Sequence, residues 1–285
     1  MKKLIISLSL VALLALSGCA WLPFGDAVYQ PGADTSPSIV DVPTSPAPTP
    51  AATPTPVVTP EPVLNPEPTP TPIPYDSSMP VAESEAVDEG WFADAVLIGD
   101  SRTDGMRLYS GIRGVDILCH KGLTVFEVME DKPVIQTADG KTGVLQALAE
   151  KQYAKVYISL GVNELGYYDD PGFADTYAAM VDRIRQLQPD ADIYLQTLIP
   201  VNTQKCKETK QPYYVTNKQV AIYNEIIRNL AVQKQTYLLE VGEIFVDESG
   251  ELFYDASFDG VHFYKDGYVR WYDYLKTHTV KEADQ

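Results

Sequence analysis

The sequence predicts an α/β fold in which helices cover both faces of a mainly parallel sheet of five strands. Short apolar runs rich in Val, Ile, Leu and Tyr alternate with segments that repeat apolar residues every three or four positions. The runs lack polar alternation, which is typical of strands buried on both faces. Strand–helix alternation favours parallel strands joined by crossover helices. Ligands of such a three-layer fold are expected beyond the carboxyl ends of its strands.

Five apolar runs are the expected strands: residues 95–98, 115–118, 156–160, 193–198 and 237–239. They are short and rich in residues that favour strands. Ser249-Gly250 separates two further apolar triplets, at 244–246 and 252–254, and predicts a hairpin turn.

Four helices are expected between and after the strands. Asp170, followed by Pro171, is the expected N-cap of a helix whose apolar residues recur from 173 to 187. Asn217 is the expected cap of a second helix, with an apolar face from 220 to 230. Residues 143–149 and 268–274 indicate two more. The apolar stripes of these helices are interpreted as core.

Residues 1–18 have the pattern of a signal peptide, with Lys2 and Lys3 before an apolar stretch from 4 to 16. Leu16-Ser17-Gly18-Cys19 resembles a bacterial lipobox. That resemblance implies cleavage before Cys19, lipidation of its thiol and a place on the extracellular face of the cell membrane. An ordinary signal peptide or a short membrane helix is the alternative, although the apolar stretch is short for a membrane span.

Residues 19–87 are expected to be a Pro/Thr-rich linker, because residues 31–80 hold 16 of the 22 prolines. Such a segment favours polyproline II structure or disorder and suits a spacer towards the cell wall, most simply as a passive tether. Residues 88–285 are expected to form one domain.

The predicted domain is acidic, with 31 Asp and Glu against 20 Lys and Arg, which argues against nucleic acid as a partner. Cys119 and Cys206 remain if Cys19 is lipidated, and the sequence leaves open whether they form a disulfide. No Cys/His cluster has metal-ligand spacing, so neither a metal nor another cofactor is expected.

Four motifs occur in a fixed order: Gly99-Asp100-Ser101, then Gly122, then Gly161-Val162-Asn163, then Asp259-Gly260-Val261-His262. Serine, histidine and an acid are the parts that turn an alcohol into a nucleophile. The ordered set resembles the SGNH hydrolases, also called GDSL esterases, over residues of about 90–280. The resemblance implies a flavodoxin-like sandwich.

By that resemblance, Ser101 is the nucleophile, His262 the general base and Asp259 the acid that orients it. The oxyanion donors would be the backbone amides of Ser101 and Gly122 and the side-chain amide of Asn163. Three rivals stay open: Gly114 for Gly122, and His120 or His278 for His262. Gly114 precedes the second strand and should lie at the opposite end of the sheet.

Two residues depart from the family pattern. Arg102 follows the serine where leucine is usual, and is expected either to contact a polar or acidic substrate or to point to solvent. Glu164 follows Asn163 where aspartate is common. Asp100 is expected to order the turn by hydrogen bonds and not to serve as a second triad acid.

The expected function is a serine esterase that hydrolyses small acyl oxygen esters, acetyl first among them, through an acyl-serine intermediate. The expected substrate is cell-surface or extracellular carbohydrate, and the aromatic side chains of Tyr109, Tyr167, Tyr168, Tyr213 and Tyr214 would suit sugar stacking. Alternatives are a cell-wall polysaccharide O-acetyltransferase and a non-catalytic wall-binding lipoprotein.

Overall fold

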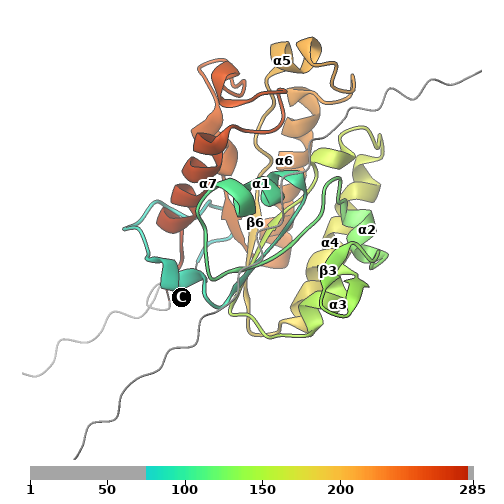
Figure 1. The fold of residues 1–285 in the computed structure, drawn as a ribbon, viewed down its shortest axis with the longest axis vertical. Coiled ribbons are helices and arrows are strands. Elements are labelled where there is room, and N and C mark those ends of the chain that lie inside the picture. Colours follow the sequence, from blue (N-terminus) through green and yellow to red (C-terminus); the bar gives the residue numbers. More distant parts are fainter. Residues whose placement is uncertain (1–74, 282–285) are drawn as a thin grey trace, which may run out of the picture. The chain divides into compact units, whose positions relative to one another are not determined.

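The computed structural model describes residues 75–281 (Figure 1). The predicted signal peptide, the lipidation site Cys19 and the linker up to residue 74 lie outside the described residues. In the part that is described, none of the helices combines the length and apolar character that crossing a membrane requires.

The centre of the fold is a five-stranded sheet whose paired strands are all parallel. In spatial order the strands are β2 (Asp116–Cys119), β1 (Ala95–Gly99), β5 (Lys155–Ser159), β6 (Asp192–Gln196) and β7 (Tyr237–Leu239). All five predicted strands are therefore confirmed, with ends shifted by one or two residues. β1 pairs with β2 on one side and with β5 on the other. Because the three strands are parallel, the loops that follow them leave the same edge of the sheet.

Helices cover both faces of this sheet, as Figure 1 shows. One face carries α1 (Ser101–Tyr109) and α7 (Lys265–Thr277), and the other carries α2 (Val125–Met129), α3 (Val144–Ala149), α4 (Asp170–Leu187) and α6 (Asn217–Lys234). Alternate strand residues supply the two cores: Leu97 and Tyr157 pack towards α7, and Val96 and Ile158 towards α4 and α6. The predicted three-layer α/β/α architecture is confirmed.

Several short elements complete the described fold. A small antiparallel hairpin joins β3 (Ile135–Thr137) to β4 (Gly140–Thr142), and α5 (Thr203–Glu208) follows β6. Four 3-10 turns span Glu89–Phe92, Val162–Glu164, Val241–Phe245 and Tyr254–Ala256. None of these elements was predicted, because their few apolar residues show no periodic pattern.

Two predicted helix caps are wrong by one residue. Asp169, not Asp170, is the N-cap of α4, and its side chain accepts a hydrogen bond from the Gly172 amide at 3.0 Å. Thr216, not Asn217, caps α6. The predicted turn at Ser249-Gly250 is present, but only Val246 and Leu252 form a β-bridge across it, because 3-10 turns flank both sides.

Residues 75–87, which precede the predicted domain boundary at residue 88, pack on the domain. The Val81 amide donates to the Leu238 carbonyl at 2.8 Å, and the Val87 amide to the Lys276 carbonyl at 2.9 Å. Val81 is buried, and the Tyr75 ring packs on Tyr237 with 4.7 Å between ring centroids. This segment covers the edge of β7, which would otherwise present unpaired backbone groups.

Candidate active site

Ser101 is the first residue of α1 and lies two positions after the end of β1. Gly99, which ends β1, is in register with Cys119 of β2 and Ser159 of β5. Asp100 caps the helix: its carboxylate accepts the Arg102 amide at 2.8 Å. Asp100 thus orders the turn, as predicted. The first backbone amides of a helix have no acceptor within it, so this turn offers N–H groups beside the serine.

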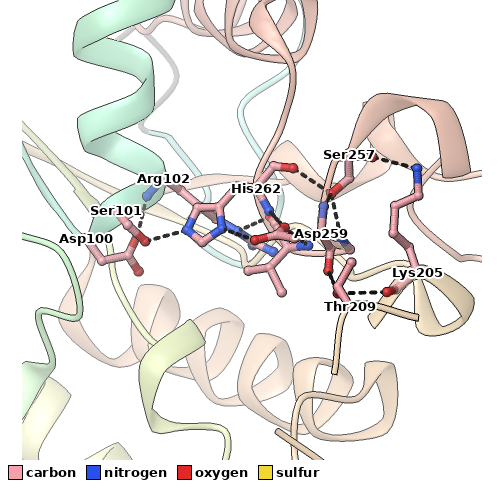
Figure 2. A network of polar contacts seen from close by, with 10 residues as sticks. Asp100, Ser101, Arg102, Lys205, Thr209, Ser257, Asp259 and His262 are labelled. Atoms are coloured by element: carbon pink, nitrogen blue, oxygen red, sulfur yellow. Dashed lines mark hydrogen bonds and ion pairs between the residues drawn. The ribbon is translucent and has the colours of Figure 1, made fainter. Parts of the chain in front are cut away.

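The structure joins Ser101, His262 and Asp259 in series (Figure 2). Ser101 Oγ lies 2.8 Å from His262 Nε2, and His262 Nδ1 lies 2.8 Å from Asp259 Oδ2. The other Asp259 oxygen accepts the backbone amides of Val261 at 2.8 Å and His262 at 2.7 Å. One short loop therefore fixes both the acid and the base.

Asp259 is held in its charged form. Burial works to raise the pKa of this carboxyl, but the hydrogen bonds from the His262 side chain and from the two loop amides outweigh it and leave the pKa below its ordinary value. The His262 side chain is 29% exposed and that of Asp259 17%, so a substrate can reach the imidazole while the carboxylate stays sheltered. An ionised acid behind the imidazole favours a proton on Nδ1 and leaves Nε2 to accept from serine.

The histidine loop is tied to its surroundings by backbone contacts. Gly260 has φ of +90°, and a Cβ there would lie 2.5 Å from Cys206 Sγ, so only glycine fits between the acid and the base. The Gly260 carbonyl accepts the Asn202 amide at 2.9 Å, and the Asp259 carbonyl accepts the Thr209 hydroxyl at 2.8 Å. Lys205 Nζ donates to the Ser257 carbonyl at 2.9 Å (Figure 2).

The loops after β2 and β5 meet beside Asp100, the residue that precedes the serine. Gly161 leaves β5 with φ of +129°, and this turn places Asn163 two residues on. Asn163 Nδ2 lies 3.0 Å from the Leu123 carbonyl and 3.4 Å from Asp100 Oδ2. Gly122 immediately precedes Leu123 and is exposed, with φ of +78°. Gly114 lies before β2, at the opposite end of that strand.

Arg102 is buried, so its side chain neither lies where a substrate could reach it nor points to solvent. Both expectations from the sequence are therefore wrong. Its side chain is 3% exposed. Nε donates to the Val261 carbonyl at 3.0 Å and Nη1 to the Ile199 carbonyl at 2.8 Å. The guanidinium thus ties the serine's helix to the histidine loop and to the loop after β6.

Replacing Arg102 with leucine is expected to lower the free energy of unfolding by about 1–3 kcal/mol, because two buried carbonyls lose charged donors. We also expect kcat to fall by about ten- to a hundredfold, since the histidine loop loses an anchor to the serine's helix. Arg107→Leu on the same helix is the matched control, because it removes a half-exposed guanidinium that contacts Asp104 and Cys119 but not the histidine loop. Equal losses in urea unfolding and ester turnover for the two variants would refute this role.

Glu164 is a second buried charge-bearing residue, and sequence reasoning marked it only as a departure from the family pattern. It is 2% exposed, and its Oε1 accepts the Val125 amide at 2.7 Å. Its Oε2 has no hydrogen-bond partner among residues 75–281. Burial, reinforced by nearby Asp100, raises the pKa of this carboxyl to about 8, against the opposing hydrogen bonds from the Val125 amide and from the Glu164 backbone. Glu164 therefore joins the asparagine loop to the start of α2 as a largely neutral acid at pH 7.

The two rival histidines do not take part in the serine contact. His278 caps the end of α7, where its ring stacks on Tyr274 with 3.7 Å between centroids. His120 is exposed in the loop after β2, and its backbone carbonyl accepts the Leu123 amide. Cys119 and Cys206, whose pairing the sequence left open, are free thiols.

A three-layer α/β fold with serine, histidine and aspartate in series at the carboxyl edge is the arrangement of serine-dependent acyl hydrolases. The family comparison agrees: the model of the GDSL-like lipase/acylhydrolase family matches residues 97–270, and the chain belongs to that family. It is therefore an enzyme of the acyl-hydrolase type, as the motif order predicted.

Among solved structures, the chain is similar to a Streptococcus pneumonia protein assigned provisionally as a platelet activating factor. Identity is 20% and the TM-score 0.52, over 64% of this chain and 82% of that one. A GDSL-like lipase from Bacteroides thetaiotaomicron is 18% identical (TM-score 0.47, covering 65% and 84% of the two chains). A carbohydrate acetylesterase from Sinorhizobium meliloti is 14% identical (TM-score 0.46, covering 64% and 96%). No curated protein matches the sequence.

Proposed function

We propose that this protein is a serine esterase that removes small acyl groups, acetyl first among them, from oxygen esters of cell-surface or extracellular carbohydrate. The observation that carries the proposal is the continuous contact from Ser101 Oγ through His262 to Asp259, with the Asn163 amide 3.4 Å from the carboxylate of Asp100, the residue before the serine. This geometry supplies a nucleophile, its base and an oxyanion donor in one site.

The proposed reaction has two halves. Ser101 Oγ attacks the ester carbonyl carbon while its proton passes to His262 Nε2, and Asp259 stabilises the resulting imidazolium. The amides of Ser101 and Gly122 and the Asn163 side chain would donate to the oxyanion. The intermediate expels the alcohol, which takes the proton from His262 and leaves an acyl-serine. Water then attacks the acyl carbon while His262 takes one of its protons. The bond from the acyl carbon to Ser101 Oγ breaks, His262 returns the proton to that oxygen, and the carboxylic acid is released.

The surroundings of Asn163 support a small substrate group. A hollow of about 260 Å³ opens there, and Thr124, Asn163 and Glu164 make part of its wall polar. A long alkyl chain gains little in such a hollow, whereas a short acyl group or a single sugar ring suits its size. The proposed location follows from the sequence: a lipid on Cys19 and a Pro/Thr-rich spacer would hold the domain outside the membrane, among surface glycans.

Hydrolysis of p-nitrophenyl acetate and p-nitrophenyl octanoate by the full-length protein tests this proposal, with Ser101→Ala alongside. We expect serine-dependent turnover with kcat/KM for the acetate at least about tenfold above the octanoate, a difference of about 1.4 kcal/mol. Preference for the octanoate would move the substrate class to lipids. Background rates from both proteins would refute simple hydrolysis and favour a transferase or a binding protein.

A further inference from the structure

Exposed aromatic side chains gather around the serine. Seven of the eleven large hydrophobic side chains exposed within residues 75–281 are Tyr or Phe in the connections that follow β5, β6 and β7. Those connections leave the sheet at its carboxyl edge, where Ser101 lies. Of the other four, Met79 precedes β1, Leu108 and Tyr109 lie in the last turn of α1, and Val232 lies near the C-terminal end of α6. Single exposed apolar residues need no explanation, but a cluster beside a catalytic centre indicates a binding surface.

One group of rings lies on the asparagine side of the serine. The Tyr214 ring covers Gly166, where an added Cβ would meet it at 2.7 Å. Tyr167 packs on Phe126 with 4.4 Å between centroids, and Tyr168 is hydrogen-bonded to Tyr213. Tyr167, Tyr214 and Phe126 line the 260 Å³ hollow together with Asn163. We call this group the tyrosine side.

A second group lies on the histidine side. The Phe258 ring is nearly parallel to the His262 ring, with 5.9 Å between centroids and 13° between planes, and it is 50% exposed. Tyr264 meets Phe258 edge to face. Tyr264 also lines a hollow of about 410 Å³ with Phe253, Asp255 and Arg270. We call this group the phenylalanine side.

The serine lies between the two sides, because Asn163 belongs to the wall of the first and His262 packs against the second. Each side combines aromatic faces with polar groups: Asn163 and Glu164 on one, Asp255 and Arg270 on the other. Pyranose rings need both, since their C–H faces stack on aromatic rings and their hydroxyls need hydrogen-bond partners. A lipid surface would favour exposed aliphatic and basic side chains, whereas the chain has a net charge of −17.

We propose that a chain of several sugar rings lies across both sides, so that the enzyme removes acyl groups from internal residues of a polysaccharide rather than from free sugars. The inference rests on the proposed esterase function and narrows its substrate to a polymer. The tyrosine side holds sugars on one flank of the reacting ester and the phenylalanine side holds those on the other.

The test is calorimetric binding of O-acetylated oligosaccharides of one to six xylose, mannose or N-acetylglucosamine residues to full-length protein carrying Ser101→Ala, which prevents turnover. We expect affinity to rise with chain length for at least one sugar. For that sugar, adding either Tyr213→Ala or Tyr264→Ala to the Ser101→Ala protein should weaken binding of the hexamer by about tenfold. Tyr109→Ala is the matched control, because this tyrosine is 51% exposed but ends α1, away from the loops.

The proposal is overturned if every hexamer binds no tighter than its monosaccharide, or if Tyr109→Ala weakens binding as much as the other two. A lipid-binding result would also overturn it. In that case a Cys19→Ala variant would bind phosphatidylglycerol vesicles but no oligosaccharide, and Tyr213→Ala or Tyr264→Ala would abolish the vesicle binding. Ser101-dependent hydrolysis of p-nitrophenyl acetate is measured in parallel. Its absence refutes the esterase function, whereas its presence without chain-length dependence refutes only the polymer surface.

Discussion

Replacing Ser101 with alanine is expected to lower kcat for p-nitrophenyl acetate by a factor on the order of 10⁴ to 10⁶. The variant keeps the backbone amides and Asn163 but has no oxygen to form an acyl intermediate. Residual turnover would come from the oxyanion donors acting on attacking water. Far-UV circular dichroism and the urea midpoint should match the unaltered protein, because the Ser101 side chain contacts only His262 among the described hydrogen bonds.

The double variant Ser101→Ala/His262→Ala tests whether the two side chains act together in catalysis or contribute to the rate independently. Serine and histidine that act together are strongly non-additive, so Ser101→Ala/His262→Ala should be no slower than Ser101→Ala alone. Ser249→Ala, on the exposed turn after β7, is the control and should leave turnover unchanged. Additive losses, or an active Ser101→Ala variant, would contradict the proposed mechanism.

Replacing Glu164 with glutamine is expected to raise the free energy of unfolding, by an amount that grows with pH. Burial raises the folded-state pKa of this carboxyl to about 8, against an ordinary value of 4.5. Below pH 4.5 both folded and unfolded chains hold the proton, and the carboxyl is not penalised. As pH rises towards 8 the unfolded chain ionises first, so the unaltered protein loses stability over that window. The limit of this loss is about 5 kcal/mol.

Urea unfolding at pH 5 and pH 8.5 measures the effect. Glutamine keeps an oxygen acceptor for the Val125 amide, so the two proteins should have similar midpoints at pH 5 and diverge at pH 8.5, with Glu164→Gln the more stable. Asp100, a neighbouring buried acid, is present in both proteins, and its repulsion of the Glu164 carboxylate is part of the expected divergence. Glu243→Gln, at an exposed position, controls for loss of a carboxyl and should show no such divergence. A gap that is constant with pH would show that Glu164 is ionised in the folded protein.

The sheet was predictable because its strands contain short apolar runs, and β1, β5 and β6 are buried along almost their whole length. The N-caps of the helices were harder to predict. Asp169 and Asp170 are adjacent carboxylates before the same proline, and only the backbone geometry decides that Asp169 accepts the Gly172 amide. The segment from Tyr75 to Val87 is polar and proline-flanked, so nothing local marks its pairing with β7 or its contact with α7.

The candidate site was predictable from motif order, while the residues that support it were not. The spacing of Asp259 and His262 indicates a loop that carries both groups, and the contact between them is present. Arg102, in contrast, is buried because two carbonyls from distant segments, Ile199 and Val261, converge on it. Glu164 is buried because the Val125 amide arrives from another loop. Such long-range partners leave no periodic signal in a sequence.

The most direct test of the central claim, that Ser101 is the nucleophile of an acyl hydrolase, is covalent labelling with a fluorophosphonate followed by peptide mass spectrometry. The mechanism predicts one phosphonate per protein on the peptide containing Ser101, with much slower labelling in His262→Ala and none at this peptide in Ser101→Ala. Labelling at another residue, or equal rates with and without His262, would contradict it.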